Sequence, residues 1–231
     1  MKRIFLFAML LCVSLMGYSQ KWNGLKNDSP TMIKTTLVSS TENEVVVDVK
    51  VDGYYSTKVN TPKGEQLIIS GKDMAPMLVE GMPNLPSYPI SIIIGDNAEM
   101  EVSIVKSEYI DIEGVEVAPS KGNLKRKVSP DDVEYVYGDV YQQDAFYPAQ
   151  AASLEKPYIL RDFRGQNITV YPYTYNPVTK TLRVYTNMLI SAKKVSDNGE
   201  NKKESLRKVR TSIDPEVKEL YKRRFINYEA S

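Results

Sequence analysis

Apolar and polar residues alternate along much of the chain, which is the pattern of β-strands that bury one face. The runs that alternate most clearly are residues 32–38, 44–52, 54–59, 65–70, 99–110 and 180–193. Residues 90–94 differ, because four isoleucines in five positions indicate a strand that is buried on both faces. The pattern predicts an all-β protein, an antiparallel sandwich of many short strands.

Turn and breaker residues separate these runs. The turn signal at residues 176–179 joins residues 167–175 to residues 180–193, which predicts the clearest hairpin of the sequence. Residues 157–165 are predicted to be a strand that ends in a turn. Residues 81–89 contain three prolines, so we expect a polyproline-like segment along a sheet edge and not a central strand.

The last part of the chain changes character. Residues 196–212 are polar and rich in Lys, Glu, Asn and Ser, which is typical of a flexible linker. Asp214 and Pro215 form a helix start, with an acidic N-cap and a proline at the first helical position. The apolar residues that follow at helical spacing are Val217, Leu220, Tyr221 and Phe225. Residues 213–231 are therefore predicted to contain a short amphipathic helix.

The first residues have the pattern of an export signal. Lys2 and Arg3 precede the apolar stretch Ile4–Met16, which is too short to span a bilayer comfortably. Small residues follow, and we expect cleavage between Ser19 and Gln20. The predicted product is an exported protein, periplasmic, secreted or at the cell surface, without stable membrane insertion. Its sandwich domain is predicted to cover residues 20–195.

Composition excludes much chemistry. The chain has no histidine, and its one cysteine, Cys12, lies inside the predicted signal. A lipoprotein signal at Cys12 is the weaker interpretation, because Leu11 stands where a small residue is needed. Without Cys and His there is no thiol nucleophile, imidazole base or disulfide, and no thiolate or imidazole ligand for zinc. We therefore expect no catalytic residue, metal site or cofactor, and a binding role.

Net charge excludes one class of partner. The formal charge of +1 includes Lys2 and Arg3, so the chain without these two residues has a charge near −1. Simple electrostatic binding of nucleic acid needs a clear positive excess. We therefore expect no nucleic-acid partner.

The most unusual stretch is Ala118–Asp139. Breaker residues precede three consecutive basic residues, Lys125, Arg126 and Lys127. A second turn signal follows, and then a strand-like run at Val133–Tyr137. The spacing alone favours a solvated hairpin tip between two extended arms. The alternative is a basic side chain that is offered to an acidic pocket of a partner.

Several strings of the sequence resemble the propeptides of gingipain-type cysteine peptidases, especially the arginine-specific ones. The strings are GMPNLPSYP (81–89), APSKG (118–122), YVYG (135–138), ILRDFRGQ (159–166), YNPVTKTLRVYT (175–186) and FINYEA (225–230). The resemblance covers nearly the whole chain after the signal, and it is strongest after Val115.

The resemblance implies a fold, a partner and a role. Such propeptides are jelly-roll-like β-sandwiches that keep the peptidase latent, assist its folding and are removed by cleavage after basic residues. An exposed loop approaches the active-site cleft, and its basic residue would here be Arg126. Lys125 and Lys127 flank it, so arginine versus lysine specificity of the partner stays open. The implied partner is a gingipain-type catalytic domain, acting in cis beyond Ser231 or in trans.

The sequence also suggests sites of proteolytic processing and an alternative function. Candidate cleavage sites after basic residues are Arg126, Arg210, Arg223 and Arg224. The alternative is a secreted binding module, an adhesin or a carbohydrate binder, that uses an exposed tyrosine face. The tyrosines of that face are Tyr171, Tyr173, Tyr175 and Tyr185. Asp162 and Arg164 are expected to form an exposed ion pair at a strand end.

Overall fold

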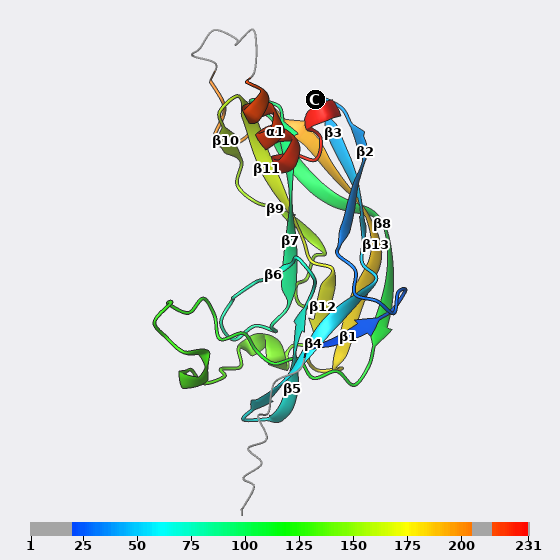
Figure 1. The fold of residues 1–231 in the computed structure, drawn as a ribbon, viewed down its shortest axis with the longest axis vertical. Coiled ribbons are helices and arrows are strands. Elements are labelled where there is room, and N and C mark those ends of the chain that lie inside the picture. Colours follow the sequence, from blue (N-terminus) through cyan, green and yellow to red (C-terminus); the bar gives the residue numbers. More distant parts are fainter. Residues whose placement is uncertain (1–19, 205–213, 231) are drawn as a thin grey trace, which may run out of the picture.

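The computed structural model describes residues 20–204 and 214–230, and most of its regular structure is antiparallel strand. The strands are β1 (Lys21–Gly24), β2 (Lys34–Ser40), β3 (Glu44–Lys50), β4 (Gly53–Thr61), β5 (Gly64–Ser70), β6 (Ala75–Pro76), β7 (Pro86–Ile94), β8 (Glu99–Ile112), β9 (Ala152–Leu154), β10 (Tyr158–Leu160), β11 (Phe163–Val170), β12 (Tyr173–Asn176) and β13 (Thr181–Ser196). The α-helix of the described residues is α1 (Pro215–Arg224). The expected jelly-roll-like, all-β sandwich with a short C-terminal helix is confirmed (Figure 1).

Three sheets make up the fold. One five-stranded sheet has the order β12-β13-β3-β2, with β8 also paired to β13, and the other has the order β10-β11-β7-β6, with β9 also paired to β11. A third sheet has the order β1-β4-β5. Figure 1 shows the two larger sheets along opposite sides of an elongated molecule, with β1, β4 and β5 at one end and α1 at the other.

Strand β13 is the centre of its sheet. It pairs with β8 along one side, and with β12 and then β3 along the other. The alternation of residues 180–193 explains this position, because Leu182, Val184 and Met188 all point into the core and are completely buried. The prediction of one buried face on this strand is confirmed.

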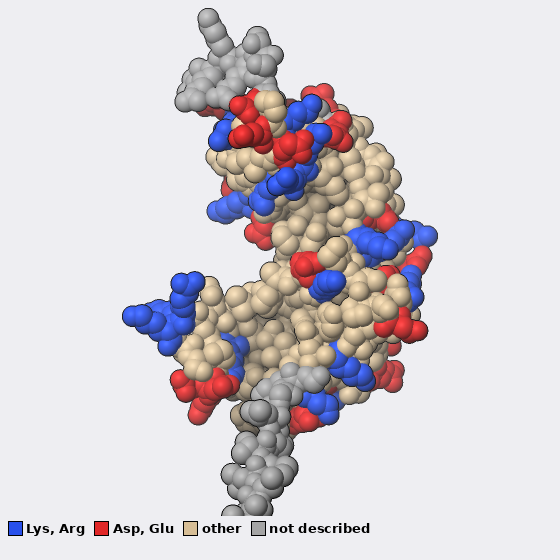
Figure 2. All heavy atoms as spheres, viewed as in Figure 1, with Lys and Arg blue, Asp and Glu red and all other residues tan. Residues whose placement is uncertain are grey.

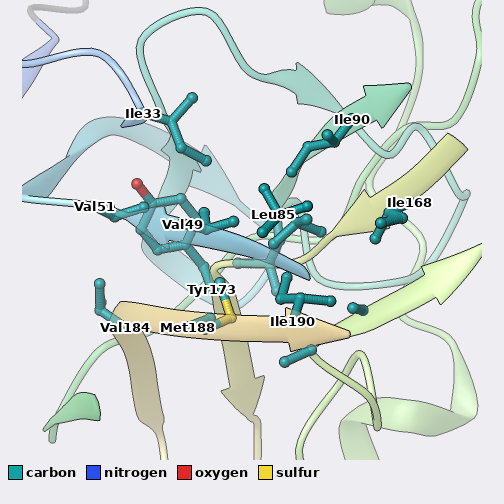
Figure 3. Packing of buried hydrophobic residues seen from close by; sticks show 14 of the residues in the cluster. Ile33, Val49, Val51, Leu85, Ile90, Ile168, Tyr173, Val184, Met188 and Ile190 are labelled. Atoms are coloured by element: carbon teal, nitrogen blue, oxygen red, sulfur yellow. The ribbon is translucent and has the colours of Figure 1, made fainter. Parts of the chain in front are cut away.

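The hydrophobic core lies between the two larger sheets (Figure 3). The valines of β3 face it, as their spacing predicts, and Val47 and Val49 have no exposed surface. From the opposite sheet, Ile92 and Ile168 are equally buried. The predicted burial of strand residues 90–94 is also confirmed, because Ser91 on the other face of β7 is buried too.

The proline-rich segment 81–89 ends in a strand, because its last four residues belong to β7, and this corrects the polyproline expectation for that part. Pro86 begins β7, and Pro89 pairs with Thr169 of β11. The carbonyl of Ser91 and the amide of Ile93 bond to a segment on the side of β7 that is opposite β11. In an antiparallel strand, the backbone groups of every second residue point to the same side. Pro89, Ser91 and Ile93 are such residues, so the position of the N–H that Pro89 lacks faces the side of β7 away from β11. Proline therefore costs β7 no ladder bond to β11.

The hairpin boundaries also differ from the prediction. Residues 157–165 are not one strand, because Arg161, with φ of 52°, turns the chain between β10 and β11. The hairpin of β12 and β13 is shorter than expected, since β12 begins only at Tyr173, after Pro172. Its turn is the predicted one, and the Asn176 side chain accepts the amide hydrogens of Val178 and Thr179 there.

Arg164 is buried, which corrects the expected ion pair with Asp162. Its side chain has 0% exposure and donates to the carbonyls of Gly95, Ala98, Glu200 and Asn201 at 2.6–3.0 Å. Asp162 instead accepts a hydrogen bond from the Tyr221 hydroxyl at 2.7 Å. Burial lowers the pKa of Arg164, and the four carbonyls replace water around its charge.

The hydrogen bonds of Arg164 to Glu200 and Asn201 also show that the start of the predicted linker is in contact with the sandwich. The amides of Gly199 and Lys203 donate to the carbonyls of Asn97 and Asp96, in the turn between β7 and β8. The first part of the linker, up to Glu204, is thus packed on the sandwich and is not a free connection. Residues 205–213, with the candidate cleavage site Arg210, lie outside the described residues.

The predicted C-terminal helix is confirmed, but Leu220 of its expected apolar face is 44% exposed. The Asp214 side chain caps α1 by accepting the amide hydrogen of Glu216, and Pro215 is its first residue. Tyr221 and Phe225 are buried and pack around the ring of Phe163. The helix is therefore part of one end of the sandwich. No helix among the described residues is long and apolar enough to cross a membrane.

The residues after α1 cover the open edge of β7. The amide of Ile226 donates to the carbonyl of Ser91. The buried Asn227 side chain accepts the Ile93 amide at 2.8 Å and donates to the Ile93 carbonyl at 3.0 Å. Asn227 thus bonds to β7 as a neighbouring strand would, and it fastens the C-terminal segment to the sheet.

Candidate functional site

A long connection between β8 and β9, residues 113–151, carries the basic cluster. It contains two short 3₁₀ turns, Pro130–Asp132 and Asp139–Gln142, and no strand, so the strand expected at Val133–Tyr137 is wrong. The edge of β5 is already occupied, since Leu67 exchanges two backbone hydrogen bonds with residues 116–118. Residues 133–137 therefore cannot pair with β5 at this position.

The basic cluster forms the tip of this connection. The amide of Val128 donates to the carbonyl of Lys125 at 2.9 Å, which places Arg126 and Lys127 at the corners of a turn. All three basic residues are exposed, and among the described residues no carboxylate forms a salt bridge with them. Figure 2 shows basic side chains at the projecting end of this loop, and the molecule is hollowed between the loop and α1. The three basic side chains of the tip are thus exposed to solvent.

The base of the loop is closed. The ammonium group of Lys121 donates to the carbonyl of Pro130 at 2.7 Å and lies 4.1 Å from the centre of the Tyr135 ring. On the near side of the loop, the amide of Gly122 donates to the Ser120 hydroxyl. The contacts of Lys121 join the two arms, and the residues between Gly122 and Pro130 project beyond them.

Two glycines hold the base of the loop against the segment before β7. The amide of Gly138 donates to the carbonyl of Gly81 at 2.9 Å, and the amide of Gly81 donates to the carbonyl of Ser120 at 3.0 Å. A Cβ atom at Gly81 would lie 3.1 Å from the Gly138 nitrogen, and Gly81 has φ of 77°. The close approach and the left-handed backbone both require glycine here.

Two tyrosines hold the same base, and one of them, Tyr137, fastens it to β4 and β5. The Tyr137 hydroxyl lies 2.6 Å from the Gln66 side-chain oxygen and 2.9 Å from the Thr61 hydroxyl, and both contacts are hydrogen bonds. The Tyr141 hydroxyl donates to the carbonyl of Val117 at 2.9 Å, and burial raises its pKa well above the usual range. The two rings meet edge to face at 4.9 Å. The loop therefore has a rigid base and an exposed tip.

Sequence reasoning found the tip but missed this base. Tyr137 and Thr61 lie 76 positions apart in the chain, and the tyrosines follow no local strand or helix period. Gly81 and Gly138 were the only available signal, because isolated glycines beside apolar runs often mark a close backbone approach.

The tyrosine face of the alternative function does not exist. Tyr173 and Tyr175 are buried, with 0% and 2% exposure, and their hydroxyls donate to the carbonyls of Gly53 and Val115. Tyr171 and Tyr185 are half-buried. Because strand β12 is covered on both faces, its tyrosines pack in the core and cannot form a row for sugar binding.

Comparison with known families decides where the chain belongs. A family model described as Propeptide_C25 matches residues 27–230, nearly all of the described chain. The chain belongs to the Propeptide_C25 family. It is accordingly a propeptide domain and not a catalytic domain.

The curated relatives of this propeptide are gingipains. The chain is 37% identical to Gingipain R1 of Porphyromonas gingivalis over 222 residues, which are 95% of the chain and 22% of that protein. It is 33% identical to Gingipain R2 of the same organism over 223 residues, again 95% of the chain and 30% of that protein. The chain therefore spans less than a third of the length of these relatives.

Two solved structures resemble the propeptide. One is described as a complex of the Porphyromonas gingivalis RgpB pro- and mature domains, and its matching chain has a TM-score of 0.77 and 34% identity. The match covers 85% of this chain and 97% of that chain. The other concerns the zymogenic latency of gingipain K from the same organism, with a TM-score of 0.63 and 21% identity over 77% of this chain and 100% of that chain. At this identity the second match shows the fold alone.

The predicted processing residues of the propeptide have unequal environments. Arg126 lies in the exposed turn. Arg223 and Arg224 end α1, and the Arg224 guanidinium donates to the Tyr158 hydroxyl at 3.2 Å while Phe225 is buried next to it. Gln20 is exposed at the start of the described chain, whereas Ser19 lies outside it. Among the predicted site residues that the structure describes, Lys125, Arg126 and Lys127 lie together at the tip, and Arg223 and Arg224 lie together at the end of α1.

Proposed function

We propose that the chain is the propeptide of a secreted gingipain-type cysteine endopeptidase, and that it keeps this peptidase latent by placing its basic loop in the active-site cleft. The observation that carries the proposal is the exposed turn Lys125–Val128 on a base held by Lys121, Tyr137 and Tyr141. Family membership supports the class of partner.

Arg126 is the residue proposed to enter the specificity pocket. Its guanidinium can form two parallel, charge-assisted hydrogen bonds with one carboxylate, which a lysine cannot do. By analogy with buried charge pairs at other interfaces, its loss would cost about 2–5 kcal/mol of binding free energy. The rigid base supports this role, because a loop that is ordered before binding loses less conformational entropy on binding.

We further propose that the chain is exported, that it assists the folding of the peptidase, and that signal cleavage occurs between Ser19 and Gln20. The charged start, the apolar stretch Ile4–Met16 and the family relationship support export. The proposed order of segments is the signal at 1–19, the sandwich from residue 20, the connection 196–212 and the helical segment 213–231.

Processing is proposed to begin at the loop. Proteases cut exposed backbone that can adopt an extended form, and the bond after Arg126 lies in an exposed turn. The bonds after Arg223 and Arg224 are helical or next to the buried Phe225, so the helix must open before they are cut. We therefore expect Arg126 to be cleaved before Arg223 and Arg224.

The test is inhibition of an arginine-specific, gingipain-type peptidase by added chain Gln20–Ser231. Arg126→Ala is expected to raise the inhibition constant at least about tenfold, a loss of roughly 1.4 kcal/mol or more. Arg126→Lys distinguishes the need for a guanidinium from the need for a positive charge. Lys106→Ala, at an exposed position of β8, is the control. A folded Arg126→Ala variant that inhibits as well as the parent would remove Arg126 from this role.

A further inference from the structure

Four exposed apolar side chains lie in or beside the basic loop. Leu78 and Val79 precede Gly81 at the base, Val128 closes the tip turn, and Val136 precedes Gly138; their exposed fractions are 42%, 46%, 40% and 52%. We name these four residues the apolar collar. Single exposed apolar residues need no explanation, but four at one loop do.

The two parts of the collar are joined by the backbone contacts of the base. The Gly138 amide donates to the Gly81 carbonyl, so Val136 and the segment Leu78–Val79 lie on adjoining stretches of chain. Leu78 lines a groove of about 1050 Å³ with Leu124 and Val133 of the loop region. Val79 lines a second hollow of about 480 Å³ together with Pro76 of β6 and Thr169 of β11. The Leu78–Val79 part of the collar thus stands between two hollows of the surface.

The backbone at Leu78 is a further sign of function. Its φ is 54°, a left-handed conformation that is uncommon for a leucine and costs free energy. Such a residue persists only when the surrounding structure holds it, and here the amides of Met77 and Met82 on either side are bonded to the carbonyls of Leu85 and Val79. Leu78 keeps this conformation although 42% of its surface is exposed.

We propose that the apolar collar docks on the rim of the peptidase cleft that receives Arg126, and that it excludes water from the buried charge pair; this inference rests on the proposed function. The reach of the loop supports the proposed contact. From Lys121 to Arg126 the chain can extend at most about 17 Å, so the base must approach the rim when the tip is inserted. Apolar contacts that surround a charged anchor exclude water and strengthen the anchor's interaction.

The test measures inhibition of the gingipain-type peptidase by collar variants that keep Arg126. Leu78→Asn is suitable because asparagine tolerates a positive φ, and Val136→Ser removes the most exposed member. Each change is expected to raise the inhibition constant about threefold to fivefold, and both together about tenfold or more, given the apolar surface that docking would bury. Val105→Ser, 60% exposed on β8 away from the loop, is the matched control and should change the constant less than twofold.

The outcomes separate this inference from the proposed function. Weaker inhibition by either collar variant, with the melting temperature and the control unchanged, supports the docking surface. If the collar variants inhibit like the parent while Arg126→Ala does not inhibit, the collar inference is overturned and the proposed function stands. If the parent chain does not inhibit, both fail. A parent dimer that the collar variants convert to monomers, with unchanged inhibition, overturns the inference in favour of self-association.

Discussion

Asn227 offers a direct test of how the C-terminal segment is held to the sandwich. Its side chain is 2% exposed and makes three hydrogen bonds, with the amide of Ile93 at 2.8 Å, the carbonyl of Ile93 at 3.0 Å and the hydroxyl of Ser40 at 3.2 Å. Asn227→Ala removes all three and leaves the amide and the carbonyl of Ile93 without these partners. An unsatisfied donor or acceptor of this kind costs about 1–3 kcal/mol, so we expect a total loss of roughly 2–4 kcal/mol of unfolding free energy.

Thermal unfolding followed by circular dichroism measures this loss. For a domain of this size, about 1 kcal/mol lowers the midpoint by about 2–4 °C, so the Asn227→Ala midpoint should fall by roughly 5–15 °C. Asn60→Ala is the control, because Asn60 is exposed on β4 and its replacement should change stability by less than about 0.5 kcal/mol. Hydrogen exchange at the Ile93 amide gives a local readout, and its protection should decrease selectively.

Two outcomes would contradict this reasoning. A midpoint for Asn227→Ala within about 1 °C of the parent would mean that water replaces the side chain at the edge of β7 without a measurable cost. Unchanged protection of the Ile93 amide would mean that another group of the chain takes the place of Asn227.

Two further predictions concern processing and pH. Cleavage after Arg126 should abolish inhibition without separating the two fragments. The strands β11 and β13 of the C-terminal fragment pair with β7, and with β3 and β8, of the N-terminal fragment. Co-elution of the fragments under native conditions checks this prediction, and their separation without denaturant would contradict it. Burial raises the pKa of Tyr173 above its ordinary value of 10.0, so the neutral phenol favours the folded state. The resulting stability is complete below pH 10 and is lost as the pH rises further. Tyr173→Phe should therefore lose less stability than the parent between pH 10 and pH 12 in urea titrations, and an equal loss would show that the other tyrosines dominate.

Local patterns of the sequence were enough for the class of the fold and for the exposed tip. The valines of residues 44–52 face the core as their spacing predicts, because the two-residue period of a strand depends only on the local backbone. The helix start at Asp214 and Pro215 follows from capping groups within one turn. The run Lys125–Lys127 is exposed, because three adjacent charges can rarely be buried without partners.

Contacts between distant segments determine the features that the local sequence patterns did not predict. Arg164 is buried because the turn at Gly95, 69 positions away, and the carbonyls of Glu200 and Asn201 surround its guanidinium. Pro89 lies in a strand because its missing N–H faces the edge away from β11. The rigid base of the loop depends on Tyr137 meeting Thr61 and Gln66. None of these environments is encoded by neighbours in the chain, since each exists only after the sheets have brought the partner groups within hydrogen-bonding distance.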